Sequence, residues 1–355
     1  MNSKINILRS DHLGEKPDQK NLVFGKTFTD HMFVMDYRED KGWHSPKIVP
    51  YGPLQAAPSM LSFHYGQAVF EGLKAYKTQD GRVLLFRPEK NMERLNKTNE
   101  RLCIPTIDVN FCVKAIKQLV SMERDWIPDA PGTSLYIRPF IIATDTTLKL
   151  RPSTSYRFMI ILSPVGNYYP QGINPVNIYV ETELVRSVQG GTGFAKFSGN
   201  YAASMKAQAQ AEENGYVQVL WLDGIERKYV EEVGSMNVFF KIGDKVLTPS
   251  LEGTILPGIT RDSVIRIIKR WNIPVEERKI SIQEVYKAHK EGLLKEAFGT
   301  GTAAVISPIG ELNWKGNKIT INNEKTGKIA KKLYNTITGI QTGKIQDDYG
   351  WITEI

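Results

Sequence analysis

The chain has 355 residues, of which 41% are hydrophobic and 24% charged, and its formal net charge is +8. This length and apolar content can bury a large core in one or two domains, but no apolar run approaches the roughly 18 residues of a membrane span. The basic residues are dispersed and no nucleic-acid-binding motif accompanies them, so neither nucleic acid nor a membrane is expected as a partner.

The two cysteines, Cys103 and Cys112, are too few for a disulfide framework. They also lack metal-ligand spacing, so we expect no metal site and a reducing compartment. The N-terminal residues contain no apolar signal core, and Asp11, Glu15 and Asp18 disfavour a transit peptide. A cytoplasmic location is expected.

The first half of the chain alternates strand-like and helix-like patterns. Alternating apolar runs predict strands, and the turn at residues 79–81 predicts a hairpin between two of them. In chain order we expect a strand at 27–37, hairpin strands at 73–76 and 83–86, helices at 91–101 and 111–124, and strands at 134–142 and 155–162.

Residues 164–175 are rich in glycine, proline and asparagine, which favour a linker. The linker would separate an N-terminal α/β domain, residues 1–163, from a C-terminal cofactor-binding domain, residues 176–355. In the second domain we expect a strand at 176–185, a helix at 201–213 that ends at Asn214-Gly215, a strand at 217–222, an amphipathic helix around 264–268, and another around 325–337.

One lysine, Lys196, stands among glycines and aromatics in residues 190–201, with Tyr201 five positions on. Small neighbours let a flat ligand or the backbone approach the amine closely, which favours a lysine that forms a Schiff base. The alternative is an ordinary exposed lysine on a glycine-rich turn.

Two further segments are consistent with a bound cofactor. Glu231 and Glu232 lie in an apolar, strand-like run, where a carboxylate needs a cation such as the protonated ring nitrogen of pyridoxal phosphate. Pro257-Gly258 opens the predicted helix at 264–268, and the N–H groups of a helix start suit a phosphate monoester. An ordinary helix start is the alternative for this second segment.

Seven motifs occur in an order that resembles the branched-chain amino-acid aminotransferases in their longer form, which belong to the fold-type IV pyridoxal-phosphate enzymes. They are residues 70–76 (FEGLKAY), 91–94 (NMER), 136–139 (YIRP), 193–201 (GFAKFSGNY), 232–237 (EVGSMN), 256–261 (LPGITR) and 298–303 (FGTGTA). The resemblance covers the chain from about Phe24 onward. It implies a mixed α/β (α+β) fold of two domains, with pyridoxal 5'-phosphate at their interface.

The resemblance also implies roles for residues around the cofactor. Lys196 would bond to the cofactor and then move the substrate proton, and Tyr201 would donate a hydrogen bond to the phenolic oxygen. Glu232 would hold the ring nitrogen, and strand alternation would turn Glu231 to solvent. The phosphate would be bound by Arg94, the backbone of Ile259 and Thr260, and the hydroxyl of Thr302, and Ser235 would contact either the phosphate or one of the residues that bind it.

For the substrate, the resemblance implies an apolar pocket with one charged group. Its aromatic walls would be Phe24, Tyr65, Phe70, Tyr136 and Tyr168, although each of these could instead be an ordinary core residue. The backbone of Thr302 and Ala303 would receive the α-carboxylate, and Arg138 would meet the side-chain carboxylate of glutamate. Leu148 and Leu150 would enter the pocket of a partner subunit, so a homodimer is expected.

The sequence departs from the family at two places. Lys149 stands between Leu148 and Leu150, which leaves fine substrate preference open. Residues 303–307 contain no thiol, whereas mammalian members carry a Cys-x-x-Cys pair there, so a redox switch of that type is not expected.

The implied reaction is reversible amino transfer from leucine, isoleucine or valine to 2-oxoglutarate, which gives branched 2-oxo acids and glutamate. D-amino-acid aminotransferases and aminodeoxychorismate lyases share the fold type and are alternatives. A pyridoxal-phosphate-binding protein without turnover is a third alternative. The joint presence of Lys196, Tyr201 and Glu232 favours an enzyme, because binding alone needs no proton shuttle.

Overall fold

The computed structural model describes residues 4–166 and 173–355. The chain forms two compact units, the first made of Met1–Tyr168, Lys196–Gly199 and Gly339–Ile355, and the second of Tyr169–Ala195 and Asn200–Thr338. The short Lys196 segment and the C-terminal segment thus group with the first unit, which differs from the simple division at 164–175. Residues 167–172 of the expected linker lie outside the described residues.

The first unit is built on a nine-stranded sheet of order β1-β3-β2-β8-β7-β5-β6-β18, with β4 paired to β7. Apart from the parallel pair β1–β3, the neighbouring strands are antiparallel. The strands are β1 (Asn6–Ile7), β2 (His31–Arg38), β3 (Gly42–Pro50), β4 (Ala68–Phe70), β5 (Leu73–Lys77), β6 (Val83–Phe86), β7 (Ser134–Ala143), β8 (Ser155–Val165) and β18 (Ile352–Glu354).

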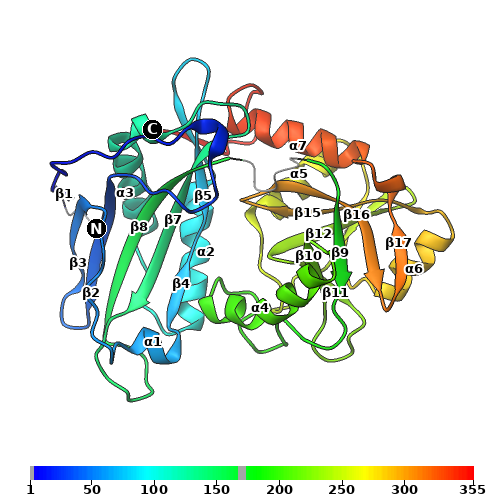
Figure 1. Ribbon diagram of the computed structural model, residues 1–355, viewed down its shortest axis with the longest axis horizontal. Helices are drawn as coiled ribbons and strands as arrows, with labels where there is room; N and C mark the ends of the chain where they lie inside the picture. Colours follow the sequence, from blue (N-terminus) through cyan, green and yellow to red (C-terminus); the bar gives the residue numbers. More distant parts are fainter. Residues whose placement is uncertain (1–3, 167–172) are drawn as a thin grey trace. The chain divides into compact units, whose positions relative to one another are not determined.

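Two amphipathic helices, α2 (Pro88–Arg101) and α3 (Val109–Met122), pack on one face of this sheet (Figure 1). The side chain of Asp108 caps α3 by accepting the Phe111 N–H, and the apolar residues of α3 recur at helical spacing. They meet inward-facing strand residues such as Leu135 and Ile137 in the main core. The short helix α1 (Leu61–Tyr65) also belongs to this unit.

The second unit contains another nine-stranded sheet, of order β11-β10-β9-β16-β15-β12-β13-β14, with β17 on β16. Because β11 pairs with both β10 and β12, the strands from β11 round to β12 close into a ring. They are β9 (Val176–Val180), β10 (Gln218–Leu222), β11 (Val230–Val233), β12 (Met236–Ile242), β13 (Lys245–Thr248), β14 (Val275–Glu277), β15 (Leu294–Gly301), β16 (Val305–Trp314) and β17 (Asn317–Thr320).

The remaining helices are α4 (Ser198–Glu213), α5 (Ile259–Arg270), α6 (Ile282–Lys290) and α7 (Lys328–Gln341). Ser281 caps α6 by accepting the Glu284 N–H. Within the described ranges 4–166 and 173–355, none of the helices combines the length and hydrophobicity that a membrane span requires.

Most of the expected elements are present, with shifted ends. The hairpin of β5 and β6 is confirmed by its register, Ala75 opposite Leu85. Two strands are shorter than expected, because β2 begins at His31 and β9 ends at Val180. The end of β9 has a local cause: the carboxylate of Glu181 accepts the N–H groups of Glu183 and Leu184, which turns the chain out of the sheet.

Candidate active site

Two side chains on one face of α2 bind the buried carboxylate of Glu71 in the first unit. Arg94 donates from Nε and Nη2 to the two carboxylate oxygens of Glu71, each at 2.8 Å. Asn91, one turn earlier, donates to Glu71 Oε2 at 2.8 Å. Glu71 is fully buried, so this bidentate contact fixes the plane of the Arg94 guanidinium.

The same helix holds the segment that contains Lys196. Thr98, one turn beyond Arg94, accepts the Lys196 N–H at 3.0 Å, and the Lys196 carbonyl accepts the Phe70 N–H at 3.1 Å. These two bonds place Nζ of Lys196 5.0 Å from the centre of the Phe70 ring. One helix therefore positions both the arginine and the lysine that the sequence singled out.

The charges of this cluster influence one another. Burial alone would raise the pKa of Glu71, but the ion pair with Arg94, helped by the charge of Lys196 and the Asn91 bond, holds that pKa below its ordinary value. Glu71 is therefore ionised between two cationic side chains. Glu71 belongs to the FEGLKAY motif, but its role becomes apparent only from its contacts in the fold.

Aromatic side chains surround the guanidinium of Arg138, which lies on β7. Its Cζ is 4.7 Å from the centre of the Phe70 ring and 5.3 Å from that of Tyr136, and Nη2 donates to the Tyr136 hydroxyl at 3.1 Å. The ring of Phe24 meets Tyr136 edge-on at 4.9 Å. Four of the predicted substrate residues thus lie together in the first unit, in contact with Lys196 through Phe70.

Gly72 permits this arrangement. A Cβ atom at Gly72 would lie 2.0 Å from the hydroxyl oxygen of Tyr136, so any other residue would displace that hydroxyl. The glycine of the FEGLKAY motif is therefore required by the close approach of Tyr136.

Tyr65 and the loop that follows β7 form a separate part of the expected pocket. The Tyr65 hydroxyl donates to the Leu148 carbonyl at 2.5 Å, and Tyr65 is itself 40% exposed. The side chains of Leu148 and Leu150 are 63% and 76% exposed, so neither packs in the core of its own unit. Tyr168 lies outside the described residues.

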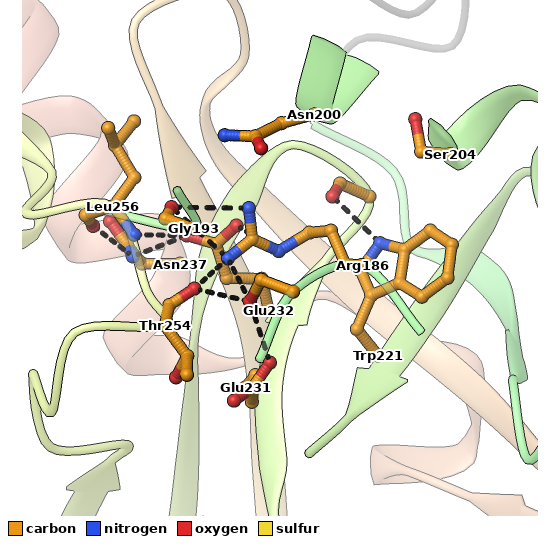
Figure 2. Close-up of polar contacts among 12 residues, drawn as sticks. Arg186, Gly193, Asn200, Ser204, Trp221, Glu231, Glu232, Asn237, Thr254 and Leu256 are labelled. Atoms are coloured by element: carbon orange, nitrogen blue, oxygen red, sulfur yellow. Dashed lines mark hydrogen bonds and ion pairs between the residues drawn. The ribbon is translucent and has the colours of Figure 1, made fainter. Parts of the chain in front are cut away.

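In the second unit the carboxylate of Glu232, on β11, is buried among donors (Figure 2). Its Oε1 accepts from the side-chain amide of Asn237 at 3.2 Å and from the Leu256 N–H at 3.1 Å. Asn237 also contacts the start of α5, because a Cβ at Gly258 would lie 2.0 Å from its Oδ1. The acid and the helix start are thus held by one amide side chain.

Arg186 is a site residue that the sequence reasoning missed. Its Nε lies 3.2 Å from Glu232 Oε2, an ion pair without hydrogen-bond geometry, while Nη2 donates to the carbonyls of Thr254 and Gly193. Figure 2 shows its side chain reaching between these groups. Arg186 stands in an irregular segment with no periodic pattern, so its partners could be identified only from the fold.

The prediction that Glu231 faces solvent is wrong. Strand alternation does send Glu231 and Glu232 to opposite faces of β11, but both are buried, at 4% and 3% exposed. The hydroxyl of Ser187 lies 3.5 Å from Glu231 Oε2, and burial, the largest influence, raises the pKa of Glu231. The strand is covered on both faces, which alternation alone cannot reveal.

Two of the other expected cofactor residues border a cavity of about 210 Å³ in the second unit. Tyr201 and Ser235 line it together with Arg186 and Glu232. Ile259 and Thr260 form the first turn of α5, whose N-cap Gly258 offers no side-chain cap. Thr302 and Ala303 lie in the tight turn between β15 and β16.

Comparison with known proteins agrees with these observations. The model of the family "Amino-transferase class IV" matches residues 68–312. The branched-chain-amino-acid aminotransferase 2 of Bacillus subtilis is 63% identical over 340 residues, which cover 96% of this chain and 94% of that protein.

Solved structures with the same fold include a branched-chain amino acid aminotransferase of Escherichia coli, with a TM-score of 0.77, 25% identity, and coverage of 91% of this chain and 98% of that one. Another is the T.th. branched-chain amino acid aminotransferase complexed with N-(5'-phosphopyridoxyl)-L-glutamate, with a TM-score of 0.74, 26% identity, and coverage of 90% and 97%. The chain belongs to the class IV aminotransferases and, within that group, to the branched-chain amino-acid aminotransferases.

Proposed function

We propose that this aminotransferase moves the amino group of leucine, isoleucine or valine to 2-oxoglutarate and that Lys196 is its catalytic residue. The observation that carries the proposal is the position of the Lys196 amine, 5.0 Å from the Phe70 ring, whose other neighbour is the Arg138 guanidinium. A reactive amine beside an apolar wall with one cation suits substrates that are either branched and apolar or dicarboxylic.

The residues present fit pyridoxal phosphate as the cofactor. Glu232 is buried and accepts two hydrogen bonds on Oε1, and a carboxylate placed in this way can hold a protonated ring nitrogen. Tyr201 and Ser235 border the same cavity and supply hydroxyl groups. The related T.th. enzyme was solved in complex with a phosphopyridoxyl derivative of glutamate, which supports this cofactor class.

We assign the phosphate to a set of groups with suitable donors. Arg94 is buried and its guanidinium is held rigidly by Glu71, so it presents a fixed positive charge. The first turn of α5 supplies backbone N–H groups at Ile259 and Thr260, and its dipole favours an anion there. Thr302 and Ser235 complete the set of proposed phosphate ligands.

When bound, the cofactor supplies an electron sink for the bond at the substrate α carbon. Lys196 takes the α proton and returns it during each half-reaction. Tyr201 donates to the phenolic oxygen, and Glu232 keeps the ring nitrogen protonated. The protein thus contributes a base, a fixed charge and orientation.

The substrate groups follow from the aromatic cluster. Phe24, Phe70 and Tyr136 present apolar surface to a branched side chain, with Tyr65 and Tyr168 as further walls. The turn at Thr302 and Ala303 is assigned to the α-carboxylate. Arg138 receives the side-chain carboxylate of glutamate or 2-oxoglutarate, because burying that group without a partner would be costly.

We also propose that the active form is a homodimer located in the cytoplasm. Leu148 and Leu150 are large, apolar and exposed, which suits residues that insert into a partner subunit. Both cysteines are free thiols, as in proteins of a reducing compartment. Light scattering of the purified protein measures the oligomeric state directly.

A coupled assay for glutamate formed from leucine and 2-oxoglutarate tests the proposed reaction. The holoenzyme is expected to be yellow and to form glutamate with each branched-chain amino acid, whereas Lys196→Ala is expected to be inactive. Lys206→Ala is the matched control, because Lys206 is an exposed lysine of the neighbouring helix α4. Normal activity in the Lys196 variant, or activity only with D-amino acids, would refute the assignment.

A further inference from the structure

A lysine that the sequence analysis left without a role lies in the sheet beside the aromatic cluster. Lys74 on β5 is directly opposite Tyr136 on β7, and Tyr136 is directly opposite Ser163 on β8. Residues directly opposite in antiparallel strands project to the same face. Lys74, Tyr136 and Ser163 therefore form a lateral row across three neighbouring strands, which Figure 1 shows side by side.

The face that carries this row is the one turned away from α2 and α3. The flanking residues Leu73, Ala75, Leu135 and Ile137 belong to the helix-covered core. By alternation, Lys74 points to the other face, together with Tyr136 and Arg138. The strand separation of about 4.8 Å lets a lysine side chain reach the neighbourhood of both β7 residues.

All three members of the row are buried. Lys74 and Tyr136 are each 8% exposed and Ser163 is 3% exposed. Burial lowers the pKa of Lys74 to about 8, so the amine keeps its proton at neutral pH. A buried ammonium group is unusual, and such groups are commonly retained where a negative ligand meets them.

Two polar atoms near the row lack partners among the described residues. The hydroxyl oxygen of Ser163 and Nε of Arg138 are buried, and neither forms a hydrogen bond within residues 4–166 and 173–355. A hydroxyl and a guanidinium N–H can both donate to a carboxylate. An unpaired buried donor is costly, so these atoms indicate a ligand with acceptor oxygens.

We propose that Lys74, together with Arg138 and Ser163, forms the subsite that binds the side-chain carboxylate of dicarboxylic amino acids and 2-oxo acids. Lys74 is then a specificity-determining residue, because it supplies a second positive charge beside Arg138. The inference rests on the proposed function, in which Arg138 alone was assigned this carboxylate. Leucine places only apolar atoms there and needs neither charge.

The subsite explains how one pocket accepts two kinds of substrate. Arg138 stacks on Phe70 and Tyr136, and its Nη2 donates to the Tyr136 hydroxyl, so one of its N–H groups is directed toward that ring and not toward a ligand. An ammonium group on the adjacent strand supplies a further charge-assisted donor to an incoming carboxylate.

The test compares Lys74→Met with Lys74→Arg in the holoenzyme, using single-turnover measurements of each half-reaction. Lys74→Met is expected to lower kcat/KM for glutamate and 2-oxoglutarate about tenfold or more. The value of kcat/KM for leucine and its 2-oxo acid is expected to change less than about twofold. Lys74→Arg keeps the charge and is expected to retain most of the dicarboxylate activity. Lys77→Met is the control, because Lys77 lies on the same strand, alternates to the other face and pairs with Asp129.

Equal losses with leucine and glutamate, or no loss with glutamate, would overturn the subsite. If Lys74→Met fails to fold, Ser163→Ala tests the same group. Ser163→Ala is expected to lower kcat/KM by about threefold for the dicarboxylic substrates only. An equal effect on leucine would again overturn the inference. Failure of the proposed function looks different, because the unmodified holoenzyme would then transfer no amino group between leucine and 2-oxoglutarate.

Discussion

Among the described residues, each unit contains a buried glutamate–arginine pair, and the two pairs differ in the distance and hydrogen-bond geometry between carboxylate and guanidinium. In the first unit, Arg94 holds both oxygens of Glu71 at 2.8 Å. In the second unit, Arg186 approaches Glu232 at 3.2 Å without hydrogen-bond geometry. The other contacts of this second pair include the Asn237 amide and backbone groups.

This difference separates two uses of the same residue types. In the Glu71–Arg94 pair each side chain satisfies the other, which fixes the guanidinium at the cost of desolvating two charges. In the Glu232–Arg186 pair, Asn237 and the Leu256 N–H also donate to the carboxylate, and the arginine also donates to the carbonyls of Thr254 and Gly193. The first pair fixes Arg94 in place, whereas the second contains the carboxylate that we propose to bind the cofactor ring nitrogen.

Removing Glu71 from the Glu71–Arg94 pair should give the largest effect on stability. Glu71→Ala leaves Arg94 buried without its partner, so the free energy of unfolding should fall by about 3–5 kcal/mol. Urea unfolding of the cofactor-free protein measures this loss. Glu232→Ala should cost less, because Arg186 keeps its two carbonyl partners, and equal costs would contradict the distinction between the pairs.

Neutralising Glu232 of the Glu232–Arg186 pair should instead reduce turnover. Glu232→Gln cannot keep the cofactor ring nitrogen protonated, so kcat with leucine should fall by about a hundredfold or more. Steady-state kinetics measure the loss. The control is Glu231→Gln: the Glu231 side chain projects from the opposite face of β11, so kcat should change less than about threefold. Similar losses in both variants would show that the wrong acid had been assigned.

Arg138 extends the comparison to an arginine that has no ion pair within the described residues 4–166 and 173–355. Arg138→Met should weaken the binding of glutamate and 2-oxoglutarate by roughly 1.5–3 kcal/mol, because one charge-assisted hydrogen bond is lost. The binding of leucine should change far less. Separate half-reactions measure the difference. If reactivity with leucine falls in the same proportion as reactivity with glutamate, Arg138 maintains the architecture of the pocket instead.

The smallest predicted effect is a dependence on pH. The pKa of Lys74 is lowered to about 8, so its ammonium form predominates below that pH and is lost as the pH rises through it. The apparent KM for 2-oxoglutarate should therefore rise several-fold between about pH 7 and pH 9, with little change for leucine. The titratable side chains that the strand register places on this face, among the described residues, include Tyr76, Tyr136, Arg138, Glu354 and the Arg157–Asp36 ion pair. Lys74→Arg should remove the dependence, and an unchanged profile in that variant would contradict the assignment to Lys74.

Local patterns predicted the elements better than the partners of individual side chains. The β5–β6 hairpin, α3 and α5 follow from turn residues and periodicity, which act over a few residues. The end of β9 was missed because one carboxylate, that of Glu181, captures the next N–H groups. Alternation correctly separated Glu231 from Glu232, but burial of both faces depends on the layers that cover the strand.

The candidate site was predicted from motif resemblance, and the structure adds the contacts between motifs. Glu71 and Arg94 belong to different motifs and meet only when α2 packs beside β4. Arg186 lies in no motif. The role of Lys74 depends on the register of three strands, which periodicity within one strand cannot supply. These partners are therefore properties of the assembled sheet.

The pairing of β18 with β6 has a consequence for the order in which the protein is synthesised. The first unit receives its edge strand from the far end of the sequence, where Ile352 lies opposite Phe86 and the Arg87 N–H donates to the Trp351 carbonyl at 2.8 Å. On the ribosome, the whole sequence of the second unit therefore emerges before the first unit can be completed. Until β18 has emerged, β6 remains an unpaired edge, which is the kind of strand that recruits other chains.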